Sequence, residues 1–476
     1  MSSEQATADL SDIERVHIVG IGGAGMSAIA RVLHGRGLRV RGSDRRSSPT
    51  TDALRSEGIG VVTGHAPENV GDADLVLASS AVPDDNVELR AARRRMIPVV
   101  RRSEFLPVLT AGYEVIAVAG AHGKTTVTGM IASLLSEAGL DPTYIVGGLV
   151  SSLETNGHSG GGRYFVIEAD EYRSTFLALR PNIAVVTNVE FDHPDCFADV
   201  GAVQSAFDEF AANIVPGGLL VACGDDRIVR ALAAERQAQG ERVTLYGKRD
   251  AADLVWRAVD IRGNAQGGIS FDVEHRGERL GEIALKIPGE FNAANALAAL
   301  GVAAEVGIDW EISHRVLAGF EGTARRFEVL GDVDGITVID DYAHHPTQIR
   351  GVLSAARQRY PGRRLVAAWE PHTFSRVRAL YGEFMGSFGE ADLLVVLPIY
   401  AAREPDDGTM TAAGLASEIA HPSVTSAATL DEAVALLAGI ARPGDVVLLM
   451  GAGNEYIVGE RLLSQLRRRT RGDGSV

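Results

Sequence analysis

The chain has 476 residues, a length that suggests about three domains. Its 46 Lys and Arg residues are outnumbered by 62 Asp and Glu residues, which gives a formal net charge of −16 and argues against binding to nucleic acid or to an anionic membrane. Only two cysteines occur, no apolar run is long enough to span a membrane, and the polar start MSSEQATADLSDIER is unlike a signal peptide. We therefore expect a cytoplasmic protein that binds anionic ligands at local sites.

Apolar segments that are typical of buried strands alternate with helix-like segments in three successive blocks. The strand-like segments are VHIVG and DLVLASS in the first block, EVIAVAG, YFVIEAD, IAVVTNV and LLVACG in the second, and ITVIDDYAHHP, RLVAAWEPH, DLLVVLP and DVVLLMGAGN in the third. This alternation predicts an α/β fold with three domains, each with a mainly parallel sheet flanked by helices. We expect a Rossmann-like N-terminal domain (12–110), a central domain like that of P-loop ATPases (111–324) and a Rossmann-like C-terminal domain (325–476).

The first strand-like segment leads directly into a glycine-rich loop, GIGGAG. The loop matches the dinucleotide fingerprint, and Asp44 falls near the position of a ribose-binding acid. Such a loop offers backbone amides to a pyrophosphate, which NAD and a UDP-sugar both contain, so the motif alone leaves both ligands open, as well as a turn without ligand. The residues that we expect at this site are Gly22, Gly23, Ala24, Gly25, Met26, Asp44, His65, Ser79 and Ser80.

A second glycine loop, GAHGKTT, opens the second block. It is shorter than the common phosphate loop, because only two residues separate its first glycine from Gly-Lys-Thr. Lysine occurs at only three positions of the chain, so its presence here favours a phosphate site that needs a compact positive charge. The residues that we expect to bind the phosphates of ATP are Gly120, Ala121, His122, Gly123, Lys124, Thr125 and Thr126.

Acidic residues follow two strand-like segments of the second block. Glu168, Asp170 and Glu171 end one segment, and together with the Thr125 hydroxyl they offer the oxygen ligands that Mg²⁺ prefers, with Mn²⁺ as an alternative. The other segment ends in TNVEFDHPD, which contains Glu190, Asp192, His193 and Asp195. We expect this second cluster to hold a second cation, with His193 as a ligand, although a structural role for this histidine is the simpler alternative.

Six motifs in this order, GIGGAGMS, GAHGKTT, EADE, TNVEFDHPD, GTARRFE and DDYAHHPT, together resemble the Mur ligase family, whose characteristic phosphate loop is the short form seen here. The resemblance runs from about residue 15 to about residue 460 and is strongest with the branch that adds L-alanine to UDP-N-acetylmuramate. It implies that ATP phosphorylates the lactyl carboxylate of UDP-N-acetylmuramate and that L-alanine then displaces phosphate from the acyl phosphate. Such a reaction belongs to peptidoglycan precursor synthesis.

The resemblance also implies roles for individual residues. Lys124 and Thr125 would hold the phosphates and the first Mg²⁺, Glu168 would be a metal ligand, and His193 would hold the second metal. Arg326 would reach the γ-phosphate, and Asp341 would position a neighbouring group or the ribose. The adenine side would be formed by Asn292 and Asn295, and the muramoyl carboxylate and L-alanine would face His344, His345, His372 and Arg376.

The chain departs from the family pattern at two places. Phe291 stands where the family commonly has histidine, and Tyr172-Arg173 replaces a Ser-Asp pair that is common in the alanine-adding branch. Several sister ligases use a carbamylated lysine near the second cluster, but no lysine occurs between Lys124 and Lys248. This absence favours the alanine-adding branch or its recycling relative, which attaches a whole peptide.

Three rival interpretations remain at this point. The recycling relative shares the short phosphate loop and the DDYAHHPT type of motif. An NAD-dependent dehydrogenase would explain GIGGAG but not the second block. A non-catalytic sensor of ATP or of a UDP-sugar would be expected to lack metal ligands, whereas Glu168 and His193 are present.

Overall fold

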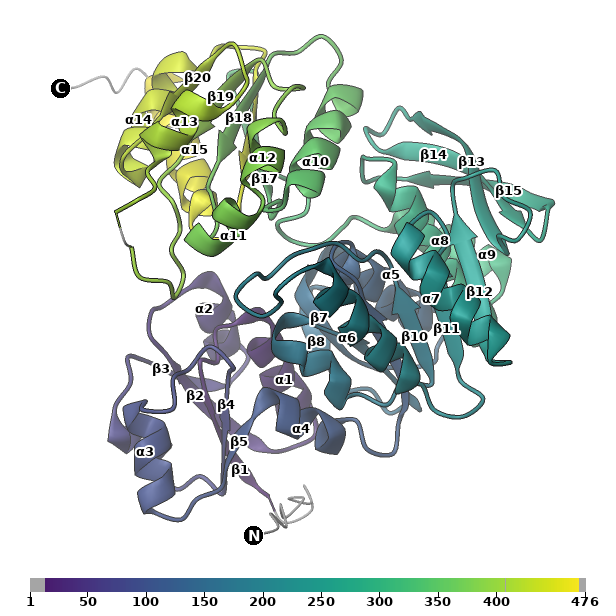
Figure 1. The fold of residues 1–476 in the computed structure, drawn as a ribbon. Helices are drawn as coiled ribbons and strands as arrows, with labels where there is room; N and C mark the ends of the chain where they lie inside the picture. Colours follow the sequence, from purple (N-terminus) through teal and green to yellow (C-terminus); the bar gives the residue numbers. More distant parts are fainter. Residues whose placement is uncertain (1–12, 407, 471–476) are drawn as a thin grey trace.

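The computed structural model describes residues 13–406 and 408–470, which form three α/β domains (Figure 1). In this view the N-terminal domain (purple to blue) lies beside the lower part of the central domain (blue to teal), and the C-terminal domain (green to yellow) lies above the N-terminal domain, beside the upper part of the central domain. The expected fold class is confirmed. The expected boundaries after residues 110 and 324 stay predictions, and the outer limits, residues 12 and 476, lie outside the described residues.

The N-terminal domain is a five-stranded parallel sheet in the order β3-β2-β1-β4-β5. Its central strand is apolar and fully buried over most of its length, as expected for a strand covered on both faces. The elements are β1 (Arg15–Val19), α1 (Ala24–Gly35), β2 (Arg39–Asp44), α2 (Pro49–Ser56), β3 (Gly60–Thr63), η2 (Pro67–Val70), β4 (Leu75–Ala78), α3 (Val87–Arg94), β5 (Val99–Arg101) and α4 (Arg102–Leu109).

The central domain is a ten-stranded sheet in the order β15-β14-β13-β12-β11-β10-β6-β9-β7-β8. Its middle strands are parallel, whereas β13 to β15 and the β7-β8 pair are antiparallel extensions that the sequence analysis did not identify. The strands are β6 (Glu114–Ala119), β7 (Thr143–Val150), β8 (Thr155–His158), β9 (Tyr164–Glu168), β10 (Ile183–Val186), β11 (Leu219–Cys223), β12 (Arg242–Gly247), β13 (Trp256–Gly263), β14 (Ile269–His275) and β15 (Glu278–Leu285). The helices are α5 (Lys124–Glu137), η3 (Ser151–Leu153), η4 (Tyr172–Ala178), α6 (Val200–Ala212), α7 (Arg227–Ala238), α8 (Phe291–Glu305) and α9 (Trp310–Gly319).

The C-terminal domain is a six-stranded sheet in the order β16-β17-β21-β18-β19-β20, parallel except for the edge strand β16. The strands are β16 (Glu328–Val333), β17 (Ile336–Asp341), β18 (Leu365–Trp369), β19 (Leu393–Val396), β20 (Val424–Ser426) and β21 (Val446–Met450). The helices are α10 (Pro346–Arg359), α11 (Phe374–Ala379), α12 (Tyr381–Met385), α13 (Ala412–Glu418), α14 (Leu430–Ile440) and α15 (Glu455–Thr470).

The apolar cores divide the molecule differently from the sheets. One continuous core runs through the N-terminal and central domains, where α1 packs on β7 and β8 so closely that a side chain at Gly157 would meet the Ala28 backbone at 2.5 Å. The C-terminal domain has separate cores on the two faces of its sheet. Because it shares little apolar surface with the other domains, we expect it to move as a unit. Among the described residues, none of the helices combines the length and apolar character that crossing a membrane requires.

Candidate active site

The short phosphate loop connects β6 to α5 and depends on its two glycines. Gly120 has φ 139° and Gly123 has φ 84°, which are conformations that favour glycine. A Cβ atom at Gly120 would lie 2.0 Å from the Thr187 hydroxyl, and one at Gly123 would lie 2.6 Å from the Asn295 amide oxygen. The loop backbone is thus packed against both neighbours, and α5 begins directly after it with its positive end towards the loop.

Lys124 points back across this loop. Its ammonium donates to the Gly120 carbonyl at 2.6 Å and to the Glu171 carboxylate at 2.7 Å. Burial works against the charge of Lys124, but the carboxylates of Glu171, Asp170 and Glu168 outweigh this effect and raise the pKa of the lysine. Lys124 therefore keeps its positive charge in a largely buried position, where a phosphate would feel it strongly.

Two of the expected metal ligands lie side by side. The Thr125 hydroxyl donates to Glu168 Oε1 at 3.1 Å, and the Gly147 amide donates to Glu168 Oε2 at 2.7 Å. The carboxylate thus stands at the end of β9, directly beside the first turn of α5. Hydroxyl and carboxylate oxygens are the donors that Mg²⁺ takes in proteins, so this pair fits the expected ion.

The residues of TNVEFDHPD do not gather into one cluster. Glu190 contacts His122 and His345, Asp192 binds Arg376, and Asp195 accepts from the Tyr172 hydroxyl at 3.0 Å. His193 adopts a left-handed backbone with φ 54° and places Nε2 3.8 Å from both Glu171 and Asp192. Of the four expected ligands of a second cation, the structure thus brings together only His193 and Asp192, with Glu171 from the other cluster.

Arg376 joins the C-terminal domain to this cluster. The Arg376 side chain is buried, with only 3% of the residue exposed. Its guanidinium donates to Asp192 at 2.6 Å and to His372 Nδ1 at 2.7 Å. His344 Nε2 lies 3.8 Å from the same Asp192 carboxylate. Residues expected on the muramoyl side therefore meet the central domain at this point, with α11 supplying the guanidinium.

The charges at this contact follow from burial and from Arg376. Burial disfavours the Asp192 carboxylate, but the guanidinium outweighs burial and holds the pKa of Asp192 well below its usual range. Burial and the same guanidinium lower the pKa of His372 to about 3 and that of His344 well below its usual value. Both imidazoles are therefore neutral at pH 7. Arg376 is the positively charged group at this contact.

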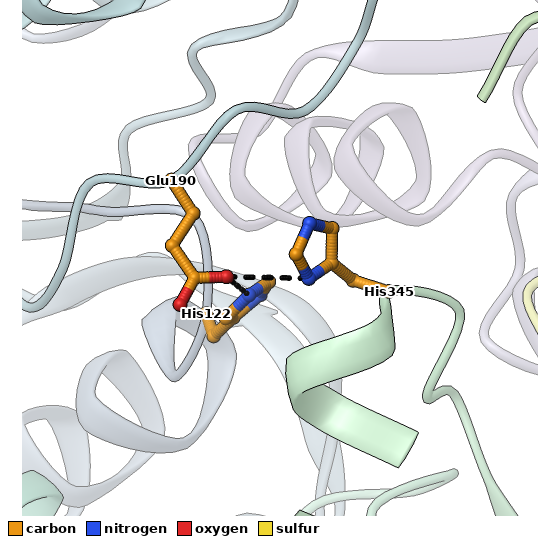
Figure 2. Close-up of side chains that lie close together, drawn as sticks. All are labelled: His122, Glu190 and His345. Carbon is orange, nitrogen blue, oxygen red and sulfur yellow. Dashed lines mark hydrogen bonds and ion pairs between the residues drawn. The ribbon is translucent and has the colours of Figure 1, made fainter. Parts of the chain in front are cut away.

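The fourth residue expected on the muramoyl side, His345, lies apart from the other three and contacts the phosphate loop (Figure 2). Its Nδ1 atom is 3.2 Å from Glu190 Oε2, which is also 3.0 Å from His122 Nε2. His345 also caps α10, where the Thr347 amide donates to Nδ1 at 3.3 Å. The DDYAHHPT motif thus divides its two histidines between two places.

Arg326 and Asp341 lie at the junction of the central and C-terminal domains. The Asp341 carboxylate accepts from the Phe327 and Ala343 amides, both at 2.8 Å, and burial raises its pKa to about 6 against the opposing charge of Arg326. The guanidinium of Arg326 lies 5.1 Å from the centre of the Tyr342 ring. The preceding arginine, in contrast, forms ion pairs inside the C-terminal domain.

Asn292 and Asn295 are buried on one face of α8. Asn292 donates to the Pro288 carbonyl at 2.7 Å, and Asn295 donates to Asn292 at 2.9 Å. Since Asn295 also touches Gly123, the pair links α8 to the phosphate loop. Phe291 is 41% exposed, and its ring lies beside Gly351 of α10 in the C-terminal domain.

The first glycine loop is held by its own neighbours. The Gly22 amide donates to Asp44 at 2.9 Å, so the expected ribose-binding carboxylate supports the loop itself. His65 belongs to a hydrogen-bonded network with Ser43 of β2 and with buried Glu88 of α3. The remaining expected residues are placed as follows: Gly23 and Ala24 exposed, Gly25 half-buried, the Met26 side chain in the core, Ser79 accepting from the Ala81 amide, and Ser80 accepting from Arg173.

Two polar residues at these sites escaped the sequence analysis. Asn188 holds both backbone groups of His122, accepting from its amide at 2.8 Å and donating to its carbonyl at 3.0 Å. Its place within TNVEFDHPD, just after the end of β10, was a signal that could have identified it. Arg102 lies against Gly25 and 3.6 Å from Asp170, with a buried Nε that has no partner, but an arginine at a helix start gave no such signal.

Comparisons with known proteins agree with this arrangement. The sequence signature of the Mur ligase family catalytic domain matches residues 15–114, that of the Mur ligase middle domain matches 118–303, and that of the Mur ligase glutamate ligase domain matches 325–453. Three domains of this kind, with a phosphate loop and acidic strand ends at their junction, define an ATP-dependent ligase. The chain belongs to the Mur ligase family.

Individual relatives narrow the class. The chain is 43% identical over 458 residues to a UDP-N-acetylmuramate–L-alanine ligase of Geobacter sp. strain M21, covering 96% of this chain and 98% of the relative. It matches the crystal structure of a UDP-N-acetylmuramate-alanine ligase from Thermotoga maritima with a TM-score of 0.81 at 29% identity, covering 96% of this chain and 99% of that one. A murein peptide ligase from Psychrobacter arcticus matches with a TM-score of 0.72 at 26% identity, covering 95% and 98%.

Proposed function

We propose that this chain is an ATP-dependent ligase that joins L-alanine to the lactyl carboxylate of UDP-N-acetylmuramate through an acyl phosphate. The observation that carries the proposal is the likeness, over 96% of the chain, to relatives that bear the name of this activity. The product is a precursor of peptidoglycan. Membership of the Mur ligase family argues against an NAD-dependent dehydrogenase. The interpretation as a non-catalytic sensor conflicts with the relatives of this chain, which are named as enzymes.

The proposed ATP site is the phosphate loop. Backbone amides of the loop and the charge of Lys124 hold the phosphates, and Asn292 and Asn295 lie on the adenine side. Lys124 exchanges its Glu171 partner for phosphate when ATP binds. Thr125 and Glu168 hold Mg²⁺ or Mn²⁺, which lowers the negative charge of the transferred phosphoryl group.

The chemical difficulty of this reaction is the approach of two anions, the lactyl carboxylate and the γ-phosphate. Arg376 binds the carboxylate from the C-terminal side, with His344 and His372 as neutral neighbours that contact the substrate or the incoming amine. Arg326 approaches the γ-phosphate from the domain junction, and Asp341 fixes the backbone of that junction. The site thus places positive charge around the reacting groups.

The UDP moiety is proposed to bind at the N-terminal glycine loop. Gly23 and Ala24 are exposed at the start of α1, where the positive helix end stabilises a pyrophosphate. Arg102 lies beside this loop and between it and Asp170 of the central domain. We propose that Arg102 contacts the part of the nucleotide sugar that extends from the glycine loop towards the phosphate loop.

The test is phosphate release from ATP and Mg²⁺ with UDP-N-acetylmuramate, using L-alanine, glycine, L-serine, the tripeptide L-Ala-γ-D-Glu-meso-diaminopimelate, or no acceptor. Release that requires both the nucleotide sugar and L-alanine supports the proposal. Release with the tripeptide and not with L-alanine would assign the chain to the peptide-adding ligases instead, and no release with any acceptor would refute ligase activity.

A further inference from the structure

Outside the proposed magnesium site, a second group of potential metal ligands spans two domains. It consists of His122 in the phosphate loop, Glu190 after β10 and His345 at the start of α10. The two imidazoles and the carboxylate converge on one point in Figure 2, and their ligand atoms all lie within 4.8 Å of one another. The side chain of His345 is 3% exposed, that of His122 is 14% exposed and that of Glu190 is 30% exposed, so the group is partly buried and open to solvent on the side of Glu190.

The hydrogen bonds of His345 determine which of its nitrogens carries the proton. Nε2 lies 3.2 Å from the Phe191 carbonyl, which can only accept, and Nδ1 is approached at 3.3 Å by the Thr347 amide, which can only donate. Both contacts require a proton on Nε2 and a lone pair on Nδ1. The Nδ1 lone pair nevertheless lies 3.2 Å from the Glu190 carboxylate, which is also an acceptor.

Two acceptors at this distance repel unless a cation lies between them. A proton on Nδ1 would satisfy Glu190 but would then oppose the Thr347 amide. A metal ion accepts electron pairs from both atoms, and on Nδ1 it takes the single lone pair in place of the Thr347 amide, whose contact is long at 3.3 Å. His122 Nε2, 3.0 Å from the same carboxylate oxygen, provides a third ligand atom on that side.

The donor set selects the kind of ion. Two imidazole nitrogens and one carboxylate oxygen suit Zn²⁺ or a similar transition metal and are a poor match for Mg²⁺, which prefers oxygen throughout. In a tetrahedral zinc site neighbouring ligand atoms lie roughly 3.3 Å apart, as follows from metal–ligand bonds of about 2.0–2.2 Å. The two measured separations from Glu190, 3.0 and 3.2 Å, are close to this value.

We propose that His122, Glu190 and His345 form a binding site for a transition metal ion of the Zn²⁺ class. Two ligands belong to the central domain and one to the C-terminal domain, so a bound ion ties the two domains together beside the phosphate loop. The proposal does not depend on the proposed ligase activity, because binding is measured without substrates or turnover.

The experiment is a titration of the metal-free protein with Co²⁺, whose visible absorption distinguishes tetrahedral from octahedral sites, followed by displacement with Zn²⁺. We expect one Co²⁺ per chain with a tetrahedral spectrum. His122→Gln keeps a donor for Glu190, and His345→Asn keeps an oxygen that caps α10, so both variants preserve local bonds while they remove a ligand nitrogen. Each of these variants, and Glu190→Gln, is expected to weaken the binding constant at least tenfold.

Two control variants separate this site from other histidines. His314→Gln removes an exposed histidine of α9, and His193→Gln removes the histidine of the Asp192 cluster. Both are expected to keep the tetrahedral spectrum and the stoichiometry. The proposal is overturned if the wild type gives no tetrahedral spectrum, if the spectrum persists unchanged in His345→Asn, or if only His193→Gln abolishes it. Zn²⁺ should also slow hydrogen exchange at the start of α10 in the wild type and not in His345→Asn, and equal exchange in both would refute the tie between domains.

Discussion

The ion pair between Arg376 and Asp192 offers the sharpest test of how the C-terminal domain contributes to the site. The two side chains come from different domains, are 3% and 4% exposed, and approach to 2.6 Å. Replacing Arg376 by Gln leaves a buried carboxylate without its charged partner, which costs about 3–5 kcal/mol in a rigid environment. The C-terminal domain has its own cores, so it can separate from the central domain and hydrate Asp192.

The cost of this substitution is therefore expected to fall on domain closure, in addition to the loss of the proposed contact between Arg376 and the lactyl carboxylate. A loss of about 3 kcal/mol in the closed arrangement corresponds to a reduction of kcat/KM by about a hundredfold, since each 1.36 kcal/mol is a factor of ten. The free energy of unfolding should change by less than about 1 kcal/mol, because the open form relieves the unpaired charge. Phosphate release and urea denaturation measure the two quantities on the same preparation.

Arg378→Gln is the matched control, because Arg378 is exposed on the same helix and donates to Thr409. We expect it to leave kcat/KM within about twofold of wild type. If Arg376→Gln lowered the free energy of unfolding by the full 3–5 kcal/mol and left kcat/KM within tenfold of wild type, the bridge would be a structural contact and the reasoning about closure would be refuted.

Three further predictions concern other buried charges. Lys124→Ala should reduce turnover by at least about a hundredfold, because it removes the charge beside the transferred phosphoryl group, and turnover within tenfold of wild type would contradict this role. Arg102→Met should raise KM for the nucleotide sugar by about tenfold and leave KM for ATP nearly unchanged, as steady-state kinetics can show. Burial and the neighbouring Glu455 raise the pKa of Glu370 to about 9. The folded state thus binds more protons than the unfolded state between about pH 4.5 and 9, and stability falls as pH rises through this range. Glu370→Gln should make the decrease in stability with rising pH smaller. The prediction would be contradicted if the variant and the wild type had the same urea midpoint at pH 5 and again at pH 8.5.

The parallel parts of the fold were predictable because their strands are apolar throughout and end abruptly in polar residues. The strand that ends at Glu168, for example, is buried along four of its five positions and reads as a continuous apolar run. The antiparallel extension was missed for the opposite reason. In β13 (Trp256–Gly263) buried and exposed positions are mixed, because one face of this strand meets solvent, and the apolar signal is correspondingly weak.

The candidate site was predictable in its residue types and only partly in its grouping. Glu190 and His193 are three positions apart, yet they face different partners, because Phe191 between them packs into the apolar cores and His193 turns through a left-handed backbone. Arg325 and Arg326 are adjacent, but only the structure shows that Arg325 is committed to Asp340. Backbone turns that redirect neighbouring side chains leave no pattern in the sequence.

The polar side chains at the junction of the domains form a continuous series of contacts that explains why binding and closure should be coupled. Lys124 pairs with Glu171 at 2.7 Å, Glu171 lies 3.8 Å from His193, His193 lies 3.8 Å from Asp192, and Asp192 pairs with Arg376 at 2.6 Å. Each of the two buried carboxylates pairs with a cationic side chain at the start of or within a helix: Glu171 with Lys124 of α5, and Asp192 with Arg376 of α11. When phosphate takes Lys124 from Glu171, the freed carboxylate attracts His193 more strongly, and His193 then contributes less to Asp192. A ligand at the phosphate loop therefore changes the electrostatic environment of Arg376 without touching it. Substituting Glu171 by Gln should strengthen ATP binding, because Lys124 then has no carboxylate partner to give up, and should weaken the response of the C-terminal domain to ATP.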